Sequence, residues 1–220
     1  MMGDRPKKEV PPLKTRKAGL ALALALALLL TLTACGTQGM PTPDPVPANT
    51  YSAEDFVVAG GFLTYDGDGP SYVGVDVSAH QGEIDWERVA DSGVEFAIIR
   101  LGFRGYGQEG TINLDKYFQQ NLEGAQRAGL KVGVYFFSQA ISVEEAEEEA
   151  RFVLENLAGA SLDYPVVYDW EAVSDSAART NGLDASTLTD CAIAFCEAVA
   201  REGYTPMIYY NSPVGYTRYQ

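Results

Sequence analysis

The sequence predicts an α/β fold built on a mainly parallel sheet. From residue 72 onward, short apolar runs alternate with helical segments. The apolar runs show little strict polar alternation, which is typical of strands covered on both faces. Each predicted helix ends at a glycine just before the next strand, the usual C-terminal signature. Alternation of strand and helix implies right-handed βαβ units. These four glycines are Gly93, Gly129, Gly159 and Gly203.

Residues 1–34 are interpreted as a lipoprotein signal peptide. A basic stretch ends at Lys17, an apolar run covers 20–30, and LTAC follows at 32–35. This order is typical of a secretory signal, and its ending resembles a bacterial lipobox, in which the chain is cut before the cysteine. Cys35 would then carry the lipid. The alternative is an uncleaved membrane span, but the run is short for a bilayer helix of roughly 20 residues. Either interpretation places the remainder outside the cytoplasm, anchored to a membrane at the cell surface.

Residues 35–72 are expected to be the lipidated cysteine, a linker and a lead-in. Four prolines in MPTPDPVP favour extended polyproline II, which would act as a semi-rigid spacer. The Gly-rich stretch 51–72 is expected to form a short hairpin or an irregular segment. The α/β domain then occupies residues 73–220.

Within that domain the sequence predicts five strands and four helices. Ser142 and Glu145 form a capping-box pattern at the start of the third helix. The glutamates between positions 144 and 149 suggest the solvated face of that helix. Cys191 and Cys196 lie in the fourth helix, where a disulfide between them is geometrically poor, so both are expected in the core. The strands are expected at 72–77, 94–100, 131–137, 165–170 and 206–210, and the helices at 85–92, 114–128, 143–158 and 186–202. A doubly wound sheet and a barrel both fit this rhythm.

The charge of the chain excludes one class of partner. The formal net charge is −14, although six of the basic residues lie in the first 17 positions. Nucleic-acid binding draws its affinity from Lys and Arg, so we expect no nucleic-acid partner. The acidic domain also gains no electrostatic attraction to an anionic membrane surface.

Candidate functional groups lie where the predicted strands end. In parallel α/β folds, such groups collect at the carboxyl ends of the strands. Three carboxylates and several aromatic rings would therefore share one rim. Taken strand by strand, the candidates are Asp76, then Arg100, then Tyr135 and Phe137, then Asp169 and Glu171, and finally Tyr209 and Asn211.

Asp169 and Glu171 form the most informative pair. Residues i and i+2 of a strand point to the same face, ~6.6 Å apart along the backbone. Two carboxylates this close raise each other's pKa, so one can hold a proton near neutral pH, and an acid beside a base is what glycosidic cleavage requires. The alternative is a pair of solvated acids. A metal site is less favoured, because hard-cation sites usually recruit more oxygen ligands and there is no histidine cluster. We expect no metal and no cofactor.

The aromatic residues at the rim suit a sugar site. Tyr135 and Phe137 share one strand face, as do Tyr209 and Asn211, and each is equally compatible with a core position. Trp170 alternates away from the Asp169 face and is expected in the core. His80, the one histidine of the chain, is expected in a loop without a catalytic role.

These residues resemble those of a known family, the family 25 glycoside hydrolases, which are lysozymes of the Chalaropsis type from bacteria and phages. GVDVSAHQG at 74–82, followed by IDW at 84–86, resembles the opening motif of the family. The later matches follow in the family's order. They are FAIIR at 96–100, Asp115 and Asn121 in the next helix, GVYFF at 133–137, PVVYDWE at 165–171 and IYYN at 208–211.

The resemblance implies a TIM-like (β/α) barrel whose last strands are missing from this chain, because the family has further strands after the segment that corresponds to 208–211. It implies cleavage of the β-1,4 bond between N-acetylmuramic acid and N-acetylglucosamine in peptidoglycan glycan strands. Glu171 would be the general acid/base and Asp169 would orient the acetamido group or stabilise developing positive charge. Asp76 would support them in the same cleft. Tyr135, Phe137, Tyr209, Asn211 and Arg100 would contact substrate.

Two other functions are compatible with this sequence. A peptidoglycan-binding surface lipoprotein would keep the cleft without the chemistry, although the presence of all three carboxylates argues against it. A glycosidase that acts on chitin-like chains could use the same pair of acids. Whether a protein nucleophile or the substrate's own acetamido group attacks stays open, because the backbone spacing falls near the boundary between the two carboxylate separations.

Overall fold

The computed structural model describes residues 50–219. The predicted signal peptide, Cys35 and the Pro-rich segment as far as Asn49 lie outside the described residues. Among residues 50–219, no helix combines the length and the apolar character needed to cross a bilayer. The residues from Tyr51 onward belong to one unit.

The lead-in is a β-hairpin, as the sequence predicted for 51–72. A short 3₁₀ helix, η1 (Ala53–Asp55), precedes β1 (Phe56–Ala59) and β2 (Phe62–Tyr65), which pair antiparallel. The turn is formed by two glycines with positive φ, Gly60 and Gly61, a conformation that residues with a side chain rarely adopt.

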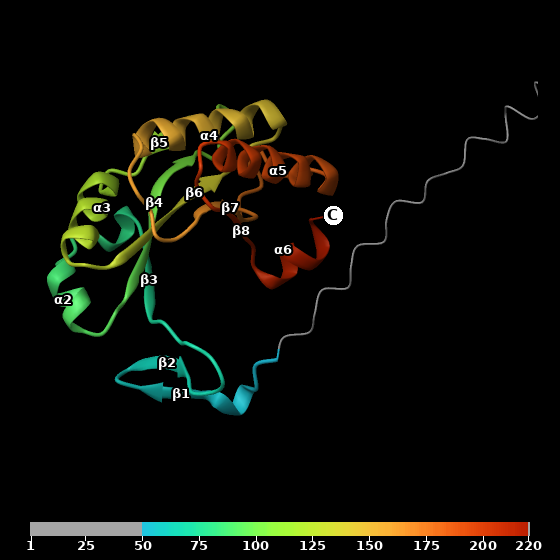
Figure 1. Cartoon of the computed structure of the whole chain (residues 1–220). Helices are drawn as coiled ribbons and strands as arrows, with labels where there is room; N and C mark the ends of the chain where they lie inside the picture. Colours follow the sequence, from blue (N-terminus) through green and yellow to red (C-terminus); the bar gives the residue numbers. More distant parts are fainter. Residues whose placement is uncertain (1–49, 220) are drawn as a thin grey trace, which may run out of the picture. The chain divides into compact units, whose positions relative to one another are not determined.

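The main sheet is parallel in the order β3-β4-β6-β7-β8, which confirms the predicted mixed α/β architecture (Figure 1). Within the described residues the strands form an open path with β3 at one end and β8 at the other. A closed barrel therefore stays a prediction. The bounds are β3 (Gly74–Val77), β4 (Phe96–Arg104), β6 (Lys131–Ser138), β7 (Val166–Trp170) and β8 (Pro206–Tyr209), with the short β5 (Ile112–Leu114) antiparallel to β4.

The helices lie where the sequence predicted, with two differences. The predicted helix 114–128 begins later, at Phe118, because Leu114 ends β5 and the Asp115 side chain accepts a hydrogen bond from the amide of Tyr117. A further helix, α6, follows β8 and is capped by Asn211. The four predicted C-terminal glycines all have positive φ. The helices are α2 (Trp86–Asp91), α3 (Phe118–Arg127), α4 (Val143–Leu157), α5 (Ala185–Arg201) and α6 (Ser212–Thr217), with a 3₁₀ turn, η2 (Ala79–Gln81), after β3.

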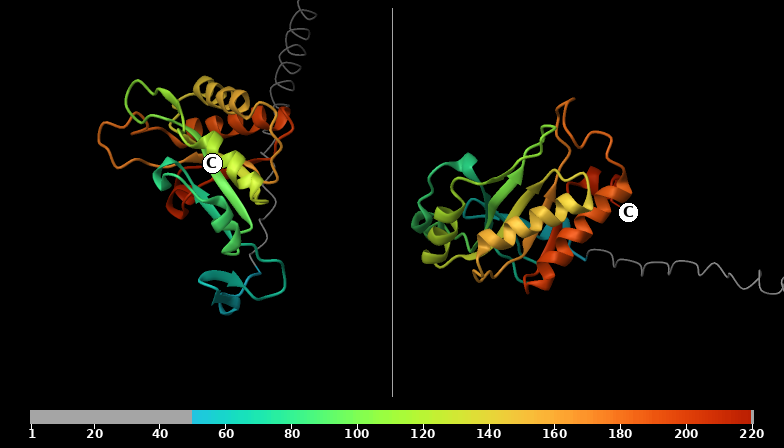
Figure 2. Two further views of the ribbon diagram at one scale, coloured as in Figure 1. Left: turned by 90° about the vertical axis from the view of Figure 1, so that its left-hand side faces the viewer. Right: turned by 90° about the horizontal axis from the view of Figure 1, so that it is seen from above.

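Helices cover one face of the sheet and form the core with it. Helix α4 packs on β4 and β6, while α5 packs on β7 and β8 and beside α4 (Figure 2). The side chains between these helices and the sheet are fully buried, among them Phe136 and Tyr168, whose rings each contact the ring of Phe195 from α5. Cys191 and Cys196 are free thiols of α5 that pack in this core, as predicted.

The second face of the sheet is not covered in the same way. In β4 and β6 the helix-facing side chains are buried, while Ile98, Arg100, Tyr135 and Phe137, two residues apart on each strand, are only partly buried. The sequence predicted strands covered on both faces, and this part of the second face is only partly covered in the described residues. The apolar residues of the second face line a cavity, which explains why the sequence showed little polar alternation.

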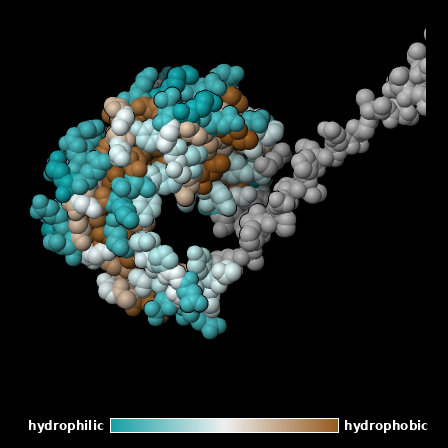
Figure 3. Space-filling model, viewed as in Figure 1, coloured by the Kyte–Doolittle hydropathy of each residue, from teal (hydrophilic) through white to brown (hydrophobic). Residues whose placement is uncertain are grey.

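Helix α4 also differs from its prediction. Hydrophilic side chains cover its outward side (Figure 3), but Glu149 is fully buried and pairs with Arg104 of β4, Nε to Oε1 2.7 Å. Arg104 also binds Glu148 at 2.8 Å. The prediction that Glu149 lies on the solvated face of the helix is therefore wrong. Glu149 can be buried because Arg104, from the sheet, pairs with its carboxylate.

Candidate active site

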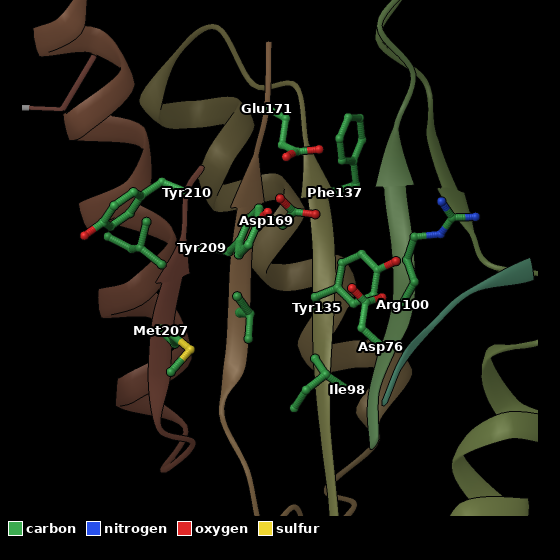
Figure 4. A pocket seen from close by; sticks show the side chains of 12 residues that line it. Asp76, Ile98, Arg100, Tyr135, Phe137, Asp169, Glu171, Met207, Tyr209 and Tyr210 are labelled. Atoms are coloured by element: carbon green, nitrogen blue, oxygen red, sulfur yellow. The ribbon is translucent and has the colours of Figure 1, made fainter. Parts of the chain in front are cut away.

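A cavity of about 590 Å³ opens on the second face of the sheet, toward the carboxyl ends of the strands (Figure 4). The register of the sheet explains which residues line the cavity, because equivalent positions of neighbouring parallel strands form rows across the face. Phe137, Asp169 and Tyr209 form one such row. The lining residues are Asp76, Ile98, Arg100, Tyr135, Phe137, Val167, Asp169, Glu171, Met207, Ile208, Tyr209 and Tyr210.

The structure brings together the three carboxylates that the sequence singled out. Asp76 comes from β3, Asp169 from β7, and Glu171 from the residue after β7 ends at Trp170. Asp169 and Glu171 lie on the same side of β7, with Glu171 nearer the strand exit (Figure 4). The i, i+2 argument is therefore confirmed for the placement of this pair.

Asp169 is a cavity carboxyl group with a strongly raised pKa. Burial and the neighbouring charges of Glu171 and Asp76 raise the pKa of Asp169 to about 7, partly offset by Arg100. One oxygen of Asp169, Oδ1, is buried without a hydrogen-bond partner, and such a group is more stable neutral than charged. Near neutral pH the site therefore holds a proton on Asp169 for part of the time.

Two tyrosines face these acids. Burial and the charge of Asp76 raise the pKa of Tyr135 well above its usual value. The charge of Glu171 is the main cause of the raised pKa of Tyr209, followed by burial. Both side chains are therefore neutral phenols over the physiological range, able to donate one hydrogen bond and to accept others.

Arg100 is fixed by a buried acid. Its Nε and Nη2 both lie 2.8 Å from Oδ2 of Asp115, which is fully buried. The same carboxylate accepts the amides of Ala79 and Tyr117. Arg100 lines the cavity, but its Nε and Nη2 are bonded to Asp115. Its predicted contact with substrate would therefore have to use Nη1 or the face of the guanidinium.

The other predicted residues take different positions. Asn211 caps α6 by accepting the amide of Val214 and is not among the cavity-lining residues. Trp170 is buried in the core, as predicted, with the guanidinium of Arg218 5.2 Å from its ring centroid. His80 is exposed in η2, which agrees with its prediction as a loop residue.

Sequence reasoning missed part of the cavity wall. Ile98, Val167 and Met207 were placed in predicted strands but not in the predicted site, although each is two residues from a predicted site residue on its strand and so shares its face. That periodicity could have identified them. Sequence reasoning also missed Gln139 and Thr180, which are hydrogen-bonded to each other, and Gln139 in turn bonds to the carbonyl of Glu171. No sequence pattern joins two residues so far apart in the chain.

Among residues 50–219, His, Cys, Asp and Glu side chains do not gather in any group of three or more that could hold an ion. The three cavity carboxylates come from separate positions along the wall, where the charges of Glu171 and Asp76 act on Asp169.

A sequence model of "Glycosyl hydrolases family 25" matches residues 75–219. The chain is 32% identical over 98 residues to an autolytic lysozyme from Clostridium acetobutylicum, which covers 44% of this chain and 28% of that protein. Across three curated relatives, the match spans between 28% and 37% of the relative's own length.

Solved structures show the same fold. The modular autolysin LytC from Streptococcus pneumoniae, also solved with a synthetic peptidoglycan ligand, superposes with a TM-score of 0.60 at 27% identity, over 74% of this chain and 39% of LytC. A muramidase from Trichobolus zukalii superposes with a TM-score of 0.51 at 27% identity, over 62% of this chain and 64% of that chain.

Proposed function

Because the chain belongs to glycosyl hydrolase family 25, we propose that its domain hydrolyses peptidoglycan at the β-1,4 bond between N-acetylmuramic acid and N-acetylglucosamine. The similar proteins are named autolytic lysozyme, autolysin and muramidase, and one was solved with a peptidoglycan ligand. Their names support the substrate class.

The observation that carries the proposal is the meeting of Asp76, Asp169 and Glu171 in one cavity beside aromatic rings. Glycoside hydrolysis needs a proton donor to the leaving oxygen and a negative group beside the positive charge that develops on the sugar. Aromatic faces and phenol hydroxyls such as those of Tyr135 and Tyr209 suit the apolar faces and hydroxyl groups of a sugar ring.

In this proposal Glu171 transfers the proton. Glu171 lies nearest the strand exit, where a glycan strand can reach it, and it would protonate the glycosidic oxygen as the bond to the sugar carbon breaks. Water then adds to that carbon and returns a proton to Glu171, so the carboxyl group is restored. Asp76, the third carboxyl group of the cavity, would add negative charge beside the pair.

Asp169 lies deeper in the same wall and would have the second role. In its neutral form it can donate a hydrogen bond to the acetamido carbonyl of the substrate. In its ionised form it can accept the acetamido N–H or stabilise positive charge on the ring. Because its pKa is raised to about 7, both forms are populated near neutral pH.

We further propose that the domain acts outside the cytoplasm, held at the membrane by lipid on Cys35, and that its sheet is part of a (β/α) barrel. The resemblance of LTAC at 32–35 to a lipobox supports the anchor. Labelling cells with a radioactive fatty acid, with Cys35→Ser as the control, tests it: label on both proteins would contradict the anchor.

The catalytic proposal is tested with Glu171→Gln. The full-length protein is incubated with purified peptidoglycan and reducing ends are counted, with products identified by mass. We expect muramic acid at the new reducing ends, and a loss of at least about 100-fold in Glu171→Gln, as for removal of a general acid. Glu147→Gln, an exposed change on α4, is the control.

Equal signals from the parent and Glu171→Gln, together with retained binding to peptidoglycan, would replace hydrolysis by binding as the function. Cleavage of chitin in preference to peptidoglycan would replace the substrate.

A further inference from the structure

The main chain of Glu171 lies just outside the sheet. The register of β6 and β7 ends with Ser138 opposite Trp170, so strand pairing does not hold the next residue of either strand. A proton donor that depends on its position therefore needs another anchor at this point.

Gln139 supplies that anchor. It follows Ser138, and its side chain is fully buried. Its Nε2 donates to the carbonyl of Glu171 at 3.0 Å and to the carbonyl of Ser138 at 2.8 Å. Its Oε1 accepts the hydroxyl of Thr180 at 2.9 Å. Both amide protons and the amide oxygen thus have partners, and the side chain extends the β6–β7 pairing by one residue.

Thr180 belongs to the loop that leaves Glu171 and leads to α5. The same loop is held elsewhere by Arg179, which binds Glu145 at 2.6 Å and whose amide donates to the carbonyl of Tyr106 at 2.9 Å. Gln108 Nε2 donates to the carbonyl of Ala177 at 2.9 Å. The loop therefore has anchors besides Thr180, whereas Gln139 bonds directly to the main chain of Glu171.

We infer that Gln139 is a positioning residue for Glu171. Its buried amide holds the main chain of Glu171 and so sets where the Glu171 carboxylate lies in the cavity. The inference rests on the proposed role of Glu171 in proton transfer. Its physical basis is that a displacement of about 1 Å in a catalytic group can reduce the rate about 100-fold. A buried carbonyl that loses its donor also tends to move toward another partner or toward water.

The matched variants are Gln139→Met, which keeps the length of the side chain but has no amide, and Thr180→Val, which keeps the shape but cannot donate to Gln139. Thr180→Ser restores the hydroxyl and serves as the conservative variant. We expect Gln139→Met to lose about 10- to 100-fold in kcat with KM within about twofold. Thr180→Val is expected to lose stability but no more than about threefold in kcat, and Thr180→Ser is expected to resemble the parent.

If Gln139 and Thr180 only fill the core, the two variants should behave alike. Gln139→Met and Thr180→Val would then lose kcat equally, each in proportion to the unfolded fraction measured by circular dichroism. Either that pattern, or full kcat in a folded Gln139→Met, would overturn the inference. A change in the pH profile of kcat in Gln139→Met, without the same change in Thr180→Val, would support it.

A second measurement does not depend on activity. In NMR spectra, the side-chain amide protons of Gln139 are expected to exchange slowly with solvent, and the carbonyl carbon of Glu171 is expected to shift in Gln139→Met and not in Glu147→Gln. If Glu171→Gln is as active as the parent, the proposed function fails. An unshifted Glu171 carbonyl in Gln139→Met contradicts the positioning inference on its own.

Discussion

Asp169 on β7 lies opposite Tyr209 on β8 in the register of the sheet. The two residues share the cavity wall, and the exposure of Tyr209 contrasts with the burial of Asp169, which has one unpaired oxygen. Asp169 is therefore a buried acid with a raised pKa, whereas Tyr209 presents an exposed ring that substrate could reach.

Asp169→Asn is expected to stabilise the folded protein at high pH. The folded-state pKa of Asp169 is raised to about 7, so the folded state binds more protons than the unfolded state between about pH 4 and 7. Its contribution to stability is complete below the unfolded-state pKa and is lost as the pH rises through 7. The Asn variant does not lose this stability as the pH rises. Its free energy of unfolding should exceed that of the parent by about 1–3 kcal/mol at pH 8, and the difference should vanish near pH 4.

Urea unfolding at pH 4.5 and pH 8 measures this difference, with the exposed Asp68→Asn as the control. An Asn variant less stable than the parent at pH 8 would contradict the assignment. Activity should fall in the same variant, which would show that the acid is kept for function at a cost in stability.

Arg104→Met is expected to destabilise the fold in a pH-dependent way. Arg104 is the partner of buried Glu149, whose pKa burial already raises to about 7. Loss of the arginine leaves a buried charge and should cost about 3–5 kcal/mol at pH 8. At pH 5 Glu149 can take up a proton, so the loss should be smaller.

Thermal and urea unfolding at both pH values test this expectation, with Arg151→Met on the exposed side of α4 as the control. Equal losses at pH 5 and pH 8 would mean that Arg104 acts through packing and not through the charge of Glu149.

Tyr209→Ala is expected to weaken substrate binding. The ring is 46% exposed, so its removal should change stability little. The lost contact with a sugar should raise KM by up to about 10-fold, corresponding to about 0.5–1.5 kcal/mol for an aromatic contact. Tyr209→Phe keeps the ring and should stay near the parent. The comparison uses initial rates over a range of peptidoglycan concentrations, and a Phe variant as weak as the Ala variant would assign the effect to the hydroxyl.

Asp115→Asn is expected to loosen the rim of the cavity. The carboxylate joins Arg100 to the amides of Ala79 and Tyr117. Asparagine has one acceptor oxygen in place of two, so the variant loses either the contact of Oδ1 with Tyr117 or the contacts of Oδ2 with Arg100 and Ala79. We therefore expect a loss of about 1–3 kcal/mol in stability. Asp91→Asn, an exposed change in α2, is the control for unfolding measurements. A variant as stable as the parent would show that the amide network does not depend on the charge.

Local patterns predicted most of the fold. Apolar runs located five of the strands, and glycines such as Gly129 and Gly203 located the helix ends, because backbone geometry imposes these choices within a few residues. Residues at or just after the strand ends, such as Asp76 in β3 and Glu171 after β7, were predicted to meet because parallel strands end at one edge.

Contacts between distant segments were not predictable in this way. The pairing of Arg104 with Glu149 and of Gln139 with Thr180 depends on how α4 and the loop after β7 pack on the sheet. The small strand β5 was missed because Ile112–Leu114 is too short to show a period. These contacts are therefore set by tertiary packing and cannot be predicted from local sequence patterns.

The alternation of cavity-facing and helix-facing side chains along β4, β6 and β7 has a consequence for evolvability. Substitutions at 98, 135, 167 and other cavity positions can reshape what the wall accepts, while the intervening residues keep the helices in place. A mutational library limited to every second residue of these strands would vary ligand preference with little loss of folded protein, and the same separation lets natural selection diversify specificity on a constant scaffold.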